Sequence, residues 1–276
     1  MDKIIKYMLE EDKGFGDVTS DALIDEDVIV NAEIISKDNG IVAGIDIIEN
    51  LFDEHQIEAI RFFDNGDKII PGDVLLKLTG NARKILYLER TALNLFMRMS
   101  GVASLTNNIV TKVKKVNPKI IIAGTRKTSP ALQTFDKQAI IIGGGDPHRF
   151  GLNDMVLIKD NHIAVVGSVT GALKRAKSNT SFSKKIEIEV ETIEDCIDVV
   201  RIGTDIVMLD NFEVKEVENT LLKLNELNLR DKVLIEISGG INEDNILDYA
   251  LLDVDIISLG ALTHSTRSLD FSLNIL

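Results

Sequence analysis

The sequence lacks several features that define whole classes of proteins. Its 276 residues include a single cysteine, Cys196, so no intrachain disulfide can form and a cysteine-rich zinc site is excluded. No apolar run approaches the roughly 18 residues that a membrane-spanning helix needs. No G-x-G-x-x-G motif follows a predicted strand, and no Walker A motif is present, so the usual nucleotide-binding signatures are missing. Because residues 1–14 form an acidic amphipathic segment and not a signal peptide, we expect a cytoplasmic protein.

Positive charge is scarce in the chain as a whole but concentrated in its middle. The 31 Lys and Arg residues face 44 Asp and Glu residues, a net charge of −13. This balance argues against nucleic-acid binding and against docking on an anionic membrane. Residues 90–162, however, carry a net charge of +7. Such a segment suggests a localised anion site; the alternative is a solvated cationic helix, as expected for residues 112–119.

The hydrophobic pattern predicts two domains. Residues 1–104 combine short alternating strands, turns and a helical stretch over 80–101, typical of a small α/β domain. From 105 to 264, near-continuous apolar runs alternate with helical segments, which indicates a parallel sheet covered on both faces. Six or seven such units favour an incomplete α/β barrel, with an open doubly wound sheet as the alternative. We expect the tail, 265–276, to pack on the first domain.

Chemically active residues follow the predicted strands of the second domain. In parallel α/β proteins such strand ends carry the functional site. The cationic residues are Arg126, Lys127, His148, Arg149 and Lys159, which suit carboxylates and phosphates. Glu189 and Asp210 form a carboxylate pair suited to Mg²⁺. Small-residue turns at 238-SGG-240 and 258-SLG-260 can hold a phosphate on backbone N–H groups.

Each of these signals also has a purely structural interpretation. Arg126 and Lys127 could be a surface pair, Asp210 could cap the next helix, and 143-GGGDPHR-149 could be a flexible loop. We interpret His162 as structural and Cys196 as a core residue. No catalytic triad order or thiolate motif is present. The combination therefore favours a substrate with anionic groups at both ends, turned over by positioning and electrostatics.

Taken together, the motifs resemble those of the quinolinate phosphoribosyltransferases, the decarboxylating nicotinate-nucleotide pyrophosphorylases of NAD biosynthesis. The similar segments are 14-GFGDVTS-20, 89-ERTALNL-95, 100-SGVA-103, 125-TRKTSP-130, 143-GGGDPHRFGL-152, 157-LIKDNH-162, 187-EIEVE-191, 208-MLDN-211, 236-EISGGI-241 and 258-SLGALTHS-265. They run in family order over nearly the whole chain. The resemblance implies an N-terminal open α/β sandwich plus an incomplete, six- or seven-stranded α/β barrel. It also implies transfer of phosphoribose to quinolinate, giving nicotinate mononucleotide, pyrophosphate and carbon dioxide with Mg²⁺.

The resemblance also assigns roles to individual residues. It implies that quinolinate is held by Arg126, His148, Arg149 and Lys159, with Arg90 donated by the neighbouring subunit of a homodimer or higher oligomer. It implies that Lys127, Glu189 and Asp210 handle pyrophosphate and its Mg²⁺, with Lys159 as a further catalytic residue. The 5′-phosphate would rest on Ser238, Gly239, Gly240, Gly260 and His264.

Two departures from the family pattern leave alternatives open. The usual TRKT-x-PGLR stretch has Ala131 in place of Gly and Gln133 in place of Arg, which removes one positive charge. A paralogous transferase-like protein associated with molybdenum uptake could act on another aromatic acid, although we expect that type to lack the segment 159-KDNH-162. The remaining alternatives are a non-catalytic protein that binds an anionic metabolite and a metal-independent barrel decarboxylase.

Overall fold

The computed structural model describes residues 3–276 and divides into two compact units. Unit 1 contains the chain up to Asn107, Ser129–Gly144 and Ser265–Leu276, and unit 2 contains Asn108–Thr128 and Gly145–His264. The expected boundary near residue 104 thus differs from the structure in one respect. The segment Ser129–Gly144, which the sequence assigned to the barrel, belongs to unit 1. It is anchored there by contacts with the long helix of that unit, described below.

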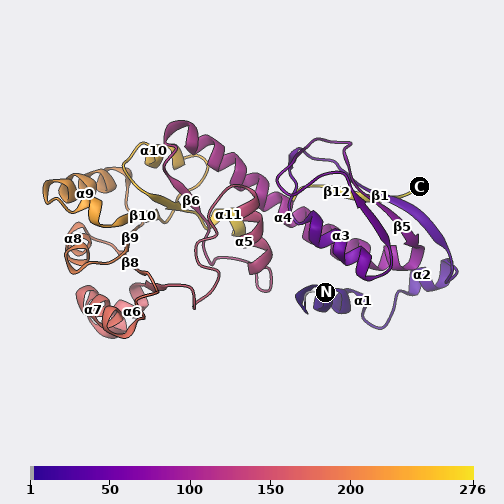
Figure 1. The fold of residues 1–276 in the computed structure, drawn as a ribbon, viewed down its shortest axis with the longest axis horizontal. Coiled ribbons are helices and arrows are strands. Elements are labelled where there is room, and N and C mark those ends of the chain that lie inside the picture. The colour runs from indigo at the N-terminus through magenta and orange to yellow at the C-terminus, as the bar shows by residue number, and fades with distance from the viewer. Residues whose placement is uncertain (1–2) are drawn as a thin grey trace. The chain divides into compact units, whose positions relative to one another are not determined.

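Unit 1 is built on a four-stranded antiparallel sheet in the order β12-β1-β5-β3 (Figure 1). Its strands are β1 (Ile29–Ser36), β3 (Glu58–Arg61), β5 (Val74–Asn81) and β12 (Phe271–Ile275). Buried and exposed residues alternate along β1, as expected for a strand with one face in the core. The last strand, β12, pairs with β1 from Ser36 opposite Phe271 to Ala32 opposite Ile275. The C-terminal tail therefore completes this sheet.

Short elements surround this sheet. A two-stranded ladder is formed by β2 (Gly40–Ile41) and β4 (Lys68–Ile69), and the helices are α1 (Lys3–Lys13), α2 (Val18–Leu23), α3 (Ile45–Glu54) and α5 (Gln133–Ile142). The 14-GFGDVTS-20 motif is a helix start, because the Asp17 carboxylate accepts hydrogen bonds from the backbone N–H groups of Thr19 and Ser20.

Ala131, just before α5, has a φ of 66°. The family's glycine is thus replaced by alanine where the backbone is left-handed, a conformation that glycine adopts most easily.

Helix α4 (Ala82–Val116) is longer than the stretch 80–101 that the sequence predicted. Its apolar stripe of Leu88, Ala92, Leu95 and Met99 is buried as expected. The basic end of the helix exposes Lys114 and Lys115 to solvent, so the charge over 112–119 belongs to a solvated surface. Within residues 3–276, no helix is long and apolar enough to cross a membrane.

Unit 2 contains a six-stranded parallel sheet in the order β6-β11-β10-β9-β8-β7. The strands are β6 (Ile121–Ala123), β7 (Val156–Ile158), β8 (Ile186–Val190), β9 (Ile206–Asp210), β10 (Leu234–Ser238) and β11 (Ile256–Ser258). Each lies within an apolar run that the sequence predicted as a strand. At the β6 edge, Asp146 forms a single parallel bridge with Ala123. The sheet is thus an incomplete barrel, as predicted.

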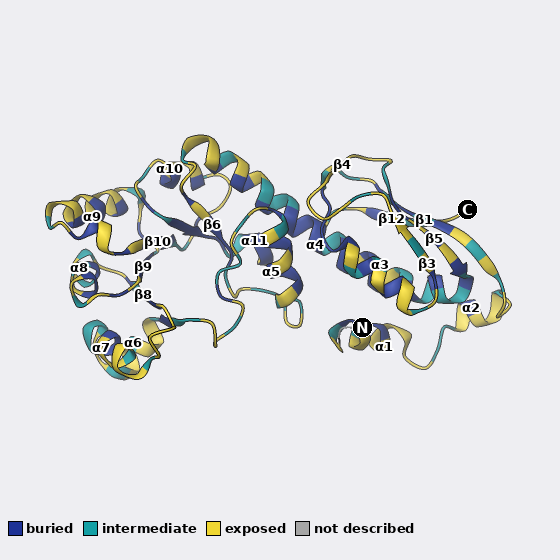
Figure 2. Cartoon of the chain, viewed as in Figure 1, coloured by how far each residue is buried: buried dark blue, intermediate teal, exposed yellow. Residues whose placement is uncertain are grey.

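Helices α6 to α9 lie on one side of this sheet (Figures 1 and 2), where α7 contacts β7 and β8 and α8 contacts β8 and β9. The helices of unit 2 are α6 (Asp160–Val166), α7 (Val169–Asn179), α8 (Ile193–Ile202), α9 (Val214–Glu226), α10 (Ile246–Ala250) and α11 (Ala261–His264), with a 3-10 turn at Arg230–Lys232. Cys196 on α8 is fully buried, and burial raises the pKa of its thiol to about 12. It is a core residue, as expected.

The strands alternate between two different environments. Residues such as Ile188 and Val207 are fully buried on the outer, helix-covered side. The intervening residues, including Glu189, Met208 and Glu236, line a pocket on the inner side. This two-residue period follows from strand geometry. It explains why an apolar strand such as 186-IEIEV-190 carries carboxylates: they face the inside of the barrel.

A buried ion pair fixes the segment Ser129–Gly144 in unit 1. Arg98 on α4 donates two hydrogen bonds of 3.0 Å to the carboxylate of Asp136 on α5, and the Asp136 side chain is fully buried. At Gly143, an added Cβ would collide with the carbonyl oxygen of Ala103. Glycine therefore allows the end of α5 to approach α4 closely.

The substitution Asp136→Ala should destabilise the protein strongly. It removes the carboxylate that accepts two hydrogen bonds from the largely buried Arg98 guanidinium, which costs about 3 kcal/mol in the free energy of unfolding. Urea denaturation followed by circular dichroism measures this loss. Asp198→Ala is the matched control, because Asp198 and Arg201 form an exposed pair at 3.9 Å and such pairs contribute less than about 1 kcal/mol. Equal effects of the two substitutions would contradict the importance of the Arg98–Asp136 pair.

Candidate active site

A pocket of about 490 Å³ lies at the carboxyl ends of the unit 2 strands. Ten residues that the sequence predicted are among those that line it: Arg126, Lys127, His148, Arg149, Lys159, Glu189, Asp210, Ser238, Gly239 and Gly240. They come from segments far apart in the sequence, which the parallel strands bring to one rim. The volume suits a small-molecule ligand. Ten of the twelve predicted barrel residues thus meet in one pocket, and Gly260 and His264 are not among its lining residues.

Two arginines form the cationic part of this pocket. Arg126 follows β6 and is exposed, whereas Arg149 is only 8% exposed. Burial lowers the pKa of Arg149, and the positive charge of Arg126 lowers it further. Two like charges are therefore held within electrostatic reach of one another. An anion placed between them would relieve that repulsion, since arginine binds carboxylates through paired N–H groups.

Lys159 and Glu189 are paired directly in this structure. Lys159 follows β7, and its Nζ donates a hydrogen bond to Glu189 Oε1 on β8. Burial raises the pKa of Glu189 and the nearby Asp210 charge adds to this rise, while Lys159 opposes it. Asp210 is not the cap of the next helix, because α9 begins at Val214 with Glu213 as its N-cap. The structural alternative for Asp210 is therefore wrong.

His148 lies deeper, between two carboxylates inside the barrel. Its Nε2 is 3.1 Å from Glu236 Oε2 and 3.3 Å from Glu187 Oε2, and both glutamate side chains are fully buried. Burial alone would lower the pKa of His148, but contacts with the two glutamates outweigh it and raise the pKa to about 10. Burial raises the pKa of Glu187 in turn. His148 is thus a cation over the neutral pH range.

A sharp turn after β10 forms another part of the pocket. Gly239 has a φ of 91°, and a Cβ added there would collide with Asn211 Oδ1. The Asn211 backbone N–H donates a 2.9 Å hydrogen bond to the Ser238 carbonyl oxygen. The Asn211 side chain donates a 2.8 Å hydrogen bond to Asp210 Oδ2. The small-residue turn and the carboxylate Asp210 are therefore positioned by the same asparagine.

Gly260 and His264 lie beside Lys127. A Cβ added to Gly260 would come within 3.0 Å of both the His264 ring and the Lys127 side chain. The Thr263 hydroxyl also donates a 2.8 Å hydrogen bond to the Lys127 carbonyl oxygen. These contacts pack the segment after β6 against helix α11 and the end of β11. The predicted phosphate residues Gly260 and His264, which follow β11, therefore lie next to a lysine.

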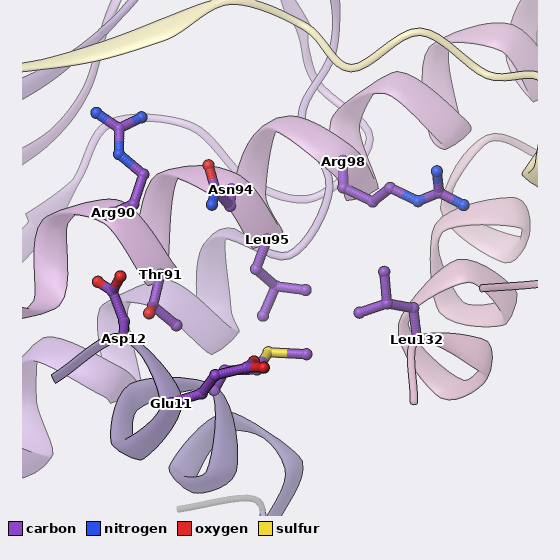
Figure 3. Close-up of a pocket in the computed structure, with 9 residues that line it drawn as sticks. Glu11, Asp12, Arg90, Thr91, Asn94, Leu95, Arg98 and Leu132 are labelled. Carbon is purple, nitrogen blue, oxygen red and sulfur yellow. The ribbon is translucent and has the colours of Figure 1, made fainter. Parts of the chain in front are cut away.

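Arg90 lies in unit 1, on helix α4, and lines a different pocket (Figure 3). Its side chain is 59% exposed and lies 4.0 Å from Glu89. In Figure 3 its guanidinium points away from Leu95 and from helix α1. Arg98, two turns further along α4, is paired with Asp136. The two arginines of α4 thus differ: Arg98 is paired at 3.0 Å with a buried carboxylate, whereas Arg90 makes a 4.0 Å contact and is exposed.

Three residues outside the predicted set of site residues also shape the barrel site. Glu236 and Asn211 line the pocket, and the Glu187 carboxylate contacts the His148 ring. The signal for the glutamates was present in the sequence, because each is a carboxylate within an otherwise apolar strand, and such residues are rarely buried without a partner. His162 is structural as expected, because its Nδ1 accepts a 3.0 Å hydrogen bond from the Lys159 backbone N–H at the start of α6.

Sequence comparison covers both units. Residues 17–100 match the profile of the quinolinate phosphoribosyl transferase N-terminal domain, and residues 102–274 match that of the C-terminal domain. The chain belongs to the quinolinate phosphoribosyl transferase family. This confirms the family that the motifs indicated, and with it the enzyme class, a phosphoribosyltransferase.

Relatives from several organisms span the whole chain. A probable nicotinate-nucleotide pyrophosphorylase (carboxylating) from Methanocaldococcus jannaschii is 50% identical, over 99% of this chain and 96% of that protein. Its counterpart from Methanothermobacter thermautotrophicus is 47% identical, over 99% and 98%. The crystal structure of nicotinate-nucleotide pyrophosphorylase from Ehrlichia chaffeensis is similar with a TM-score of 0.92 and 34% identity, over 99% of this chain and 98% of that one. The predicted fold of the quinolinate phosphoribosyl transferases is thereby confirmed.

Proposed function

We propose that this chain transfers the phosphoribosyl group of phosphoribosyl pyrophosphate to quinolinate and releases carbon dioxide. The products are nicotinate mononucleotide and pyrophosphate, and the reaction belongs to de novo NAD biosynthesis. The observation that carries the proposal is the pocket itself, in which Arg126, Arg149, Lys127 and Lys159 gather in a chain of net charge −13. Such a cluster fits an anionic substrate. The names of the full-length relatives support the same reaction.

The cations divide between the two substrates. Arg126 and Arg149 suit the two adjacent carboxylates of quinolinate, because Arg126 lies close enough to lower the pKa of Arg149. His148 and Lys159 add two further donors to this side of the pocket. Lys127, beside Gly260 and His264, suits the phosphate and pyrophosphate groups. The turn at 238–240 would hold the 5′-phosphate on backbone N–H groups.

Glu189 and Asp210 fit a Mg²⁺ ion. They lie near the carboxyl ends of the neighbouring strands β8 and β9, and the charge of Asp210 raises the pKa of Glu189. A carboxylate whose proton affinity is raised by a neighbouring carboxylate is stabilised by a divalent cation, and oxygen ligands are those that Mg²⁺ prefers. When bound with the substrate, the ion would neutralise charge that develops on the pyrophosphate leaving group. Lys159 would then exchange its bond to Glu189 for one to quinolinate.

The side chains would act mainly by holding the reacting atoms in place. The pyridine nitrogen of quinolinate bonds to C1 of the ribose while the bond from C1 to pyrophosphate breaks. Arg126 and Arg149, which we call the arginine clamp, would hold the two carboxylates and so fix the ring for this attack. The C2 carboxylate then leaves as carbon dioxide, its bonding electrons stay on the ring carbon, and that carbon takes up a proton. No side-chain nucleophile is required, which agrees with the residues of the pocket.

We also propose that the enzyme is a homodimer or a higher oligomer in which Arg90 enters the site of the neighbouring subunit. The exposure of Arg90 and its long contact with Glu89 support a role in binding something outside its own unit. The cytoplasmic location inferred from the sequence stays a prediction.

A single assay tests the reaction and its metal. Purified protein with quinolinate, phosphoribosyl pyrophosphate and Mg²⁺ should give nicotinate mononucleotide and carbon dioxide in a one-to-one ratio. Excess EDTA should lower turnover by roughly 100-fold or more, and added Mg²⁺ should restore it. Nicotinate in place of quinolinate should give no product. Turnover of nicotinate would contradict the proposed substrate, and insensitivity to EDTA would contradict the metal.

A further inference from the structure

The His148 ring reaches across the inside of the barrel. Its loop enters at the open edge of the sheet, where Asp146 bridges to Ala123 on β6. Its Nε2 contacts Glu187 on β8 and Glu236 on β10, at 3.3 Å and 3.1 Å. These two strands are separated by β9. The three side chains therefore connect the open edge of the barrel with its opposite wall.

The backbone at His148 is held in an unusual conformation. Its φ is 54°, in the left-handed region that a residue with a Cβ seldom adopts. The His148 backbone N–H donates a 2.6 Å hydrogen bond to Asp146 Oδ1, and the ring is held by the two glutamates. Strained residues persist where surrounding contacts over-determine them, and they cluster at functional sites. The direction of the His148 ring is therefore set by its neighbours.

The contacts of Nε2 decide what the other ring nitrogen can do. Because Nε2 faces carboxylates, it carries a proton in both charge states of the ring. A neutral ring would then have an unprotonated Nδ1, which accepts hydrogen bonds and disfavours an anion, whereas a charged ring has an Nδ1–H donor. Within residues 3–276, the hydrogen bonds and ion pairs of His148 use its backbone N–H and Nε2, and His148 lines the substrate pocket. Only the charged ring can bind a carboxylate through Nδ1.

We infer that Glu187 and Glu236 are positioning residues of the dicarboxylate site, which fix Nε2 of His148 and hold the ring as an imidazolium that presents Nδ1–H to a substrate carboxylate. This inference rests on the proposed function for the identity of the dicarboxylate. Beyond the proposed function, two buried glutamates that need not touch the substrate then have a defined part in binding the substrate.

The buried carboxylates depend on His148 for their own stability. Glu187 Oε1, Glu187 Oε2 and Glu236 Oε1 are buried without a hydrogen-bond partner among the residues that the structure describes. The 3.3 Å contact of Glu187 with His148 is therefore an ion pair. Two further charged groups lie within electrostatic reach of Glu187: the charge of Glu189 raises the pKa of Glu187, and Glu187 opposes the lowering of the Arg149 pKa. The neighbouring strands contribute uncharged residues to the pocket: Leu157, Met208 and Ser258. On the other side of His148, a second cavity is lined by the charged residues Asp146, Asp154 and Lys185.

The double variant Glu187→Gln/Glu236→Gln tests the inference, because it keeps the shape of both side chains and removes their charge. In the wild type, KM for quinolinate should stay constant between pH 6 and 8.5, since the pKa of His148 is about 10. In the variant, the ring should lose its proton within this range. KM for quinolinate should then rise about tenfold between pH 6 and 8.5, while KM for phosphoribosyl pyrophosphate and kcat change little.

Two controls separate this effect from a general loss of structure. Glu226→Gln on helix α9, where the side chain is 65% exposed, should behave as the wild type at every pH. Nitrogen-15 NMR of the wild-type histidines, with the His148 signal identified by its loss in His148→Gln, should show both ring nitrogens protonated at pH 8. This measurement remains informative even if the double variant fails to fold.

The possible outcomes are distinct. A pH-independent rise in KM, or a His148 ring that is neutral at pH 8, would overturn the inference. One equivalent of tightly bound transition metal, lost in the double variant, would also overturn it, because the same three side chains could then act as metal ligands. Absence of quinolinate turnover by the wild type would contradict the proposed function instead, while the NMR result would still decide the charge of the ring.

Discussion

Arg126→Ala is expected to lower kcat/KM for quinolinate about a thousandfold while the protein stays folded. The guanidinium would bind a substrate carboxylate through two charge-assisted hydrogen bonds, and each such bond contributes about 1.5–3 kcal/mol. The fold should be unaffected, because Arg126 is exposed and exposed substitutions usually change stability by less than about 0.5 kcal/mol. Steady-state kinetics with varied quinolinate, together with a thermal denaturation curve, measure both effects.

The matched control is Arg201→Ala on helix α8. Arg201 is 57% exposed and forms only a 3.9 Å contact with Asp198, so it loses the same atoms and charge without touching the pocket. Its kcat/KM should equal that of the wild type. If Arg126→Ala kept near-normal kcat/KM for quinolinate, the assignment of Arg126 to the substrate clamp would be wrong.

Mixing two inactive variants, Arg90→Ala and Arg126→Ala, should restore about a quarter of the wild-type activity. If Arg90 serves the site of the neighbouring subunit, a mixed dimer contains one site in which both arginines are intact and one in which both are missing. Random exchange makes half of the dimers mixed, and half of their sites are active. Activity of the equimolar mixture after co-refolding or co-expression measures this recovery.

The control for this experiment places both substitutions in one chain and mixes that double variant with the wild type. When Arg90 acts across the interface, a mixed dimer of this kind has no intact site. The activity of this mixture then comes from wild-type homodimers alone and should be about a quarter of the wild-type value. If instead Arg90 acted within its own subunit, the first mixture would stay inactive and the second would keep about half of the wild-type activity. That result would contradict the donated arginine.

The arrangement of the second unit was largely predictable from local sequence pattern. The six apolar runs became the six parallel strands, because short apolar segments between helices can hardly form anything but covered parallel strands. Ten of the predicted site residues reached the same pocket because parallel strands place their carboxyl ends at one rim. Strand-end position is a property of the sequence, so the gathering of Arg126, Lys159 and Asp210 could be anticipated without coordinates.

Other features depended on packing between distant segments. The segment 129–144 joined unit 1 because Asp136 is paired with Arg98, 38 residues earlier in the chain. Nothing in the local sequence of α5 shows that Asp136 pairs with a residue of unit 1 and not with a residue of the barrel. Lys159, likewise, was predicted to bind quinolinate. In the structure its Nζ contacts the Glu189 carboxylate, because that is an opposite charge within its reach.

By itself, the sequence determined which residues are cations, which strands are apolar and which turns are built from small residues. These properties follow from residue type and from the two-residue alternation of side chains along a strand. Only the tertiary structure decided that His148 crosses the barrel to meet Glu187 and Glu236, which lie 39 and 88 residues further along the chain. That contact depends on the curvature of the sheet and on a left-handed backbone at His148. Both result from long-range packing, so no local pattern of residues could have revealed the charge of that ring.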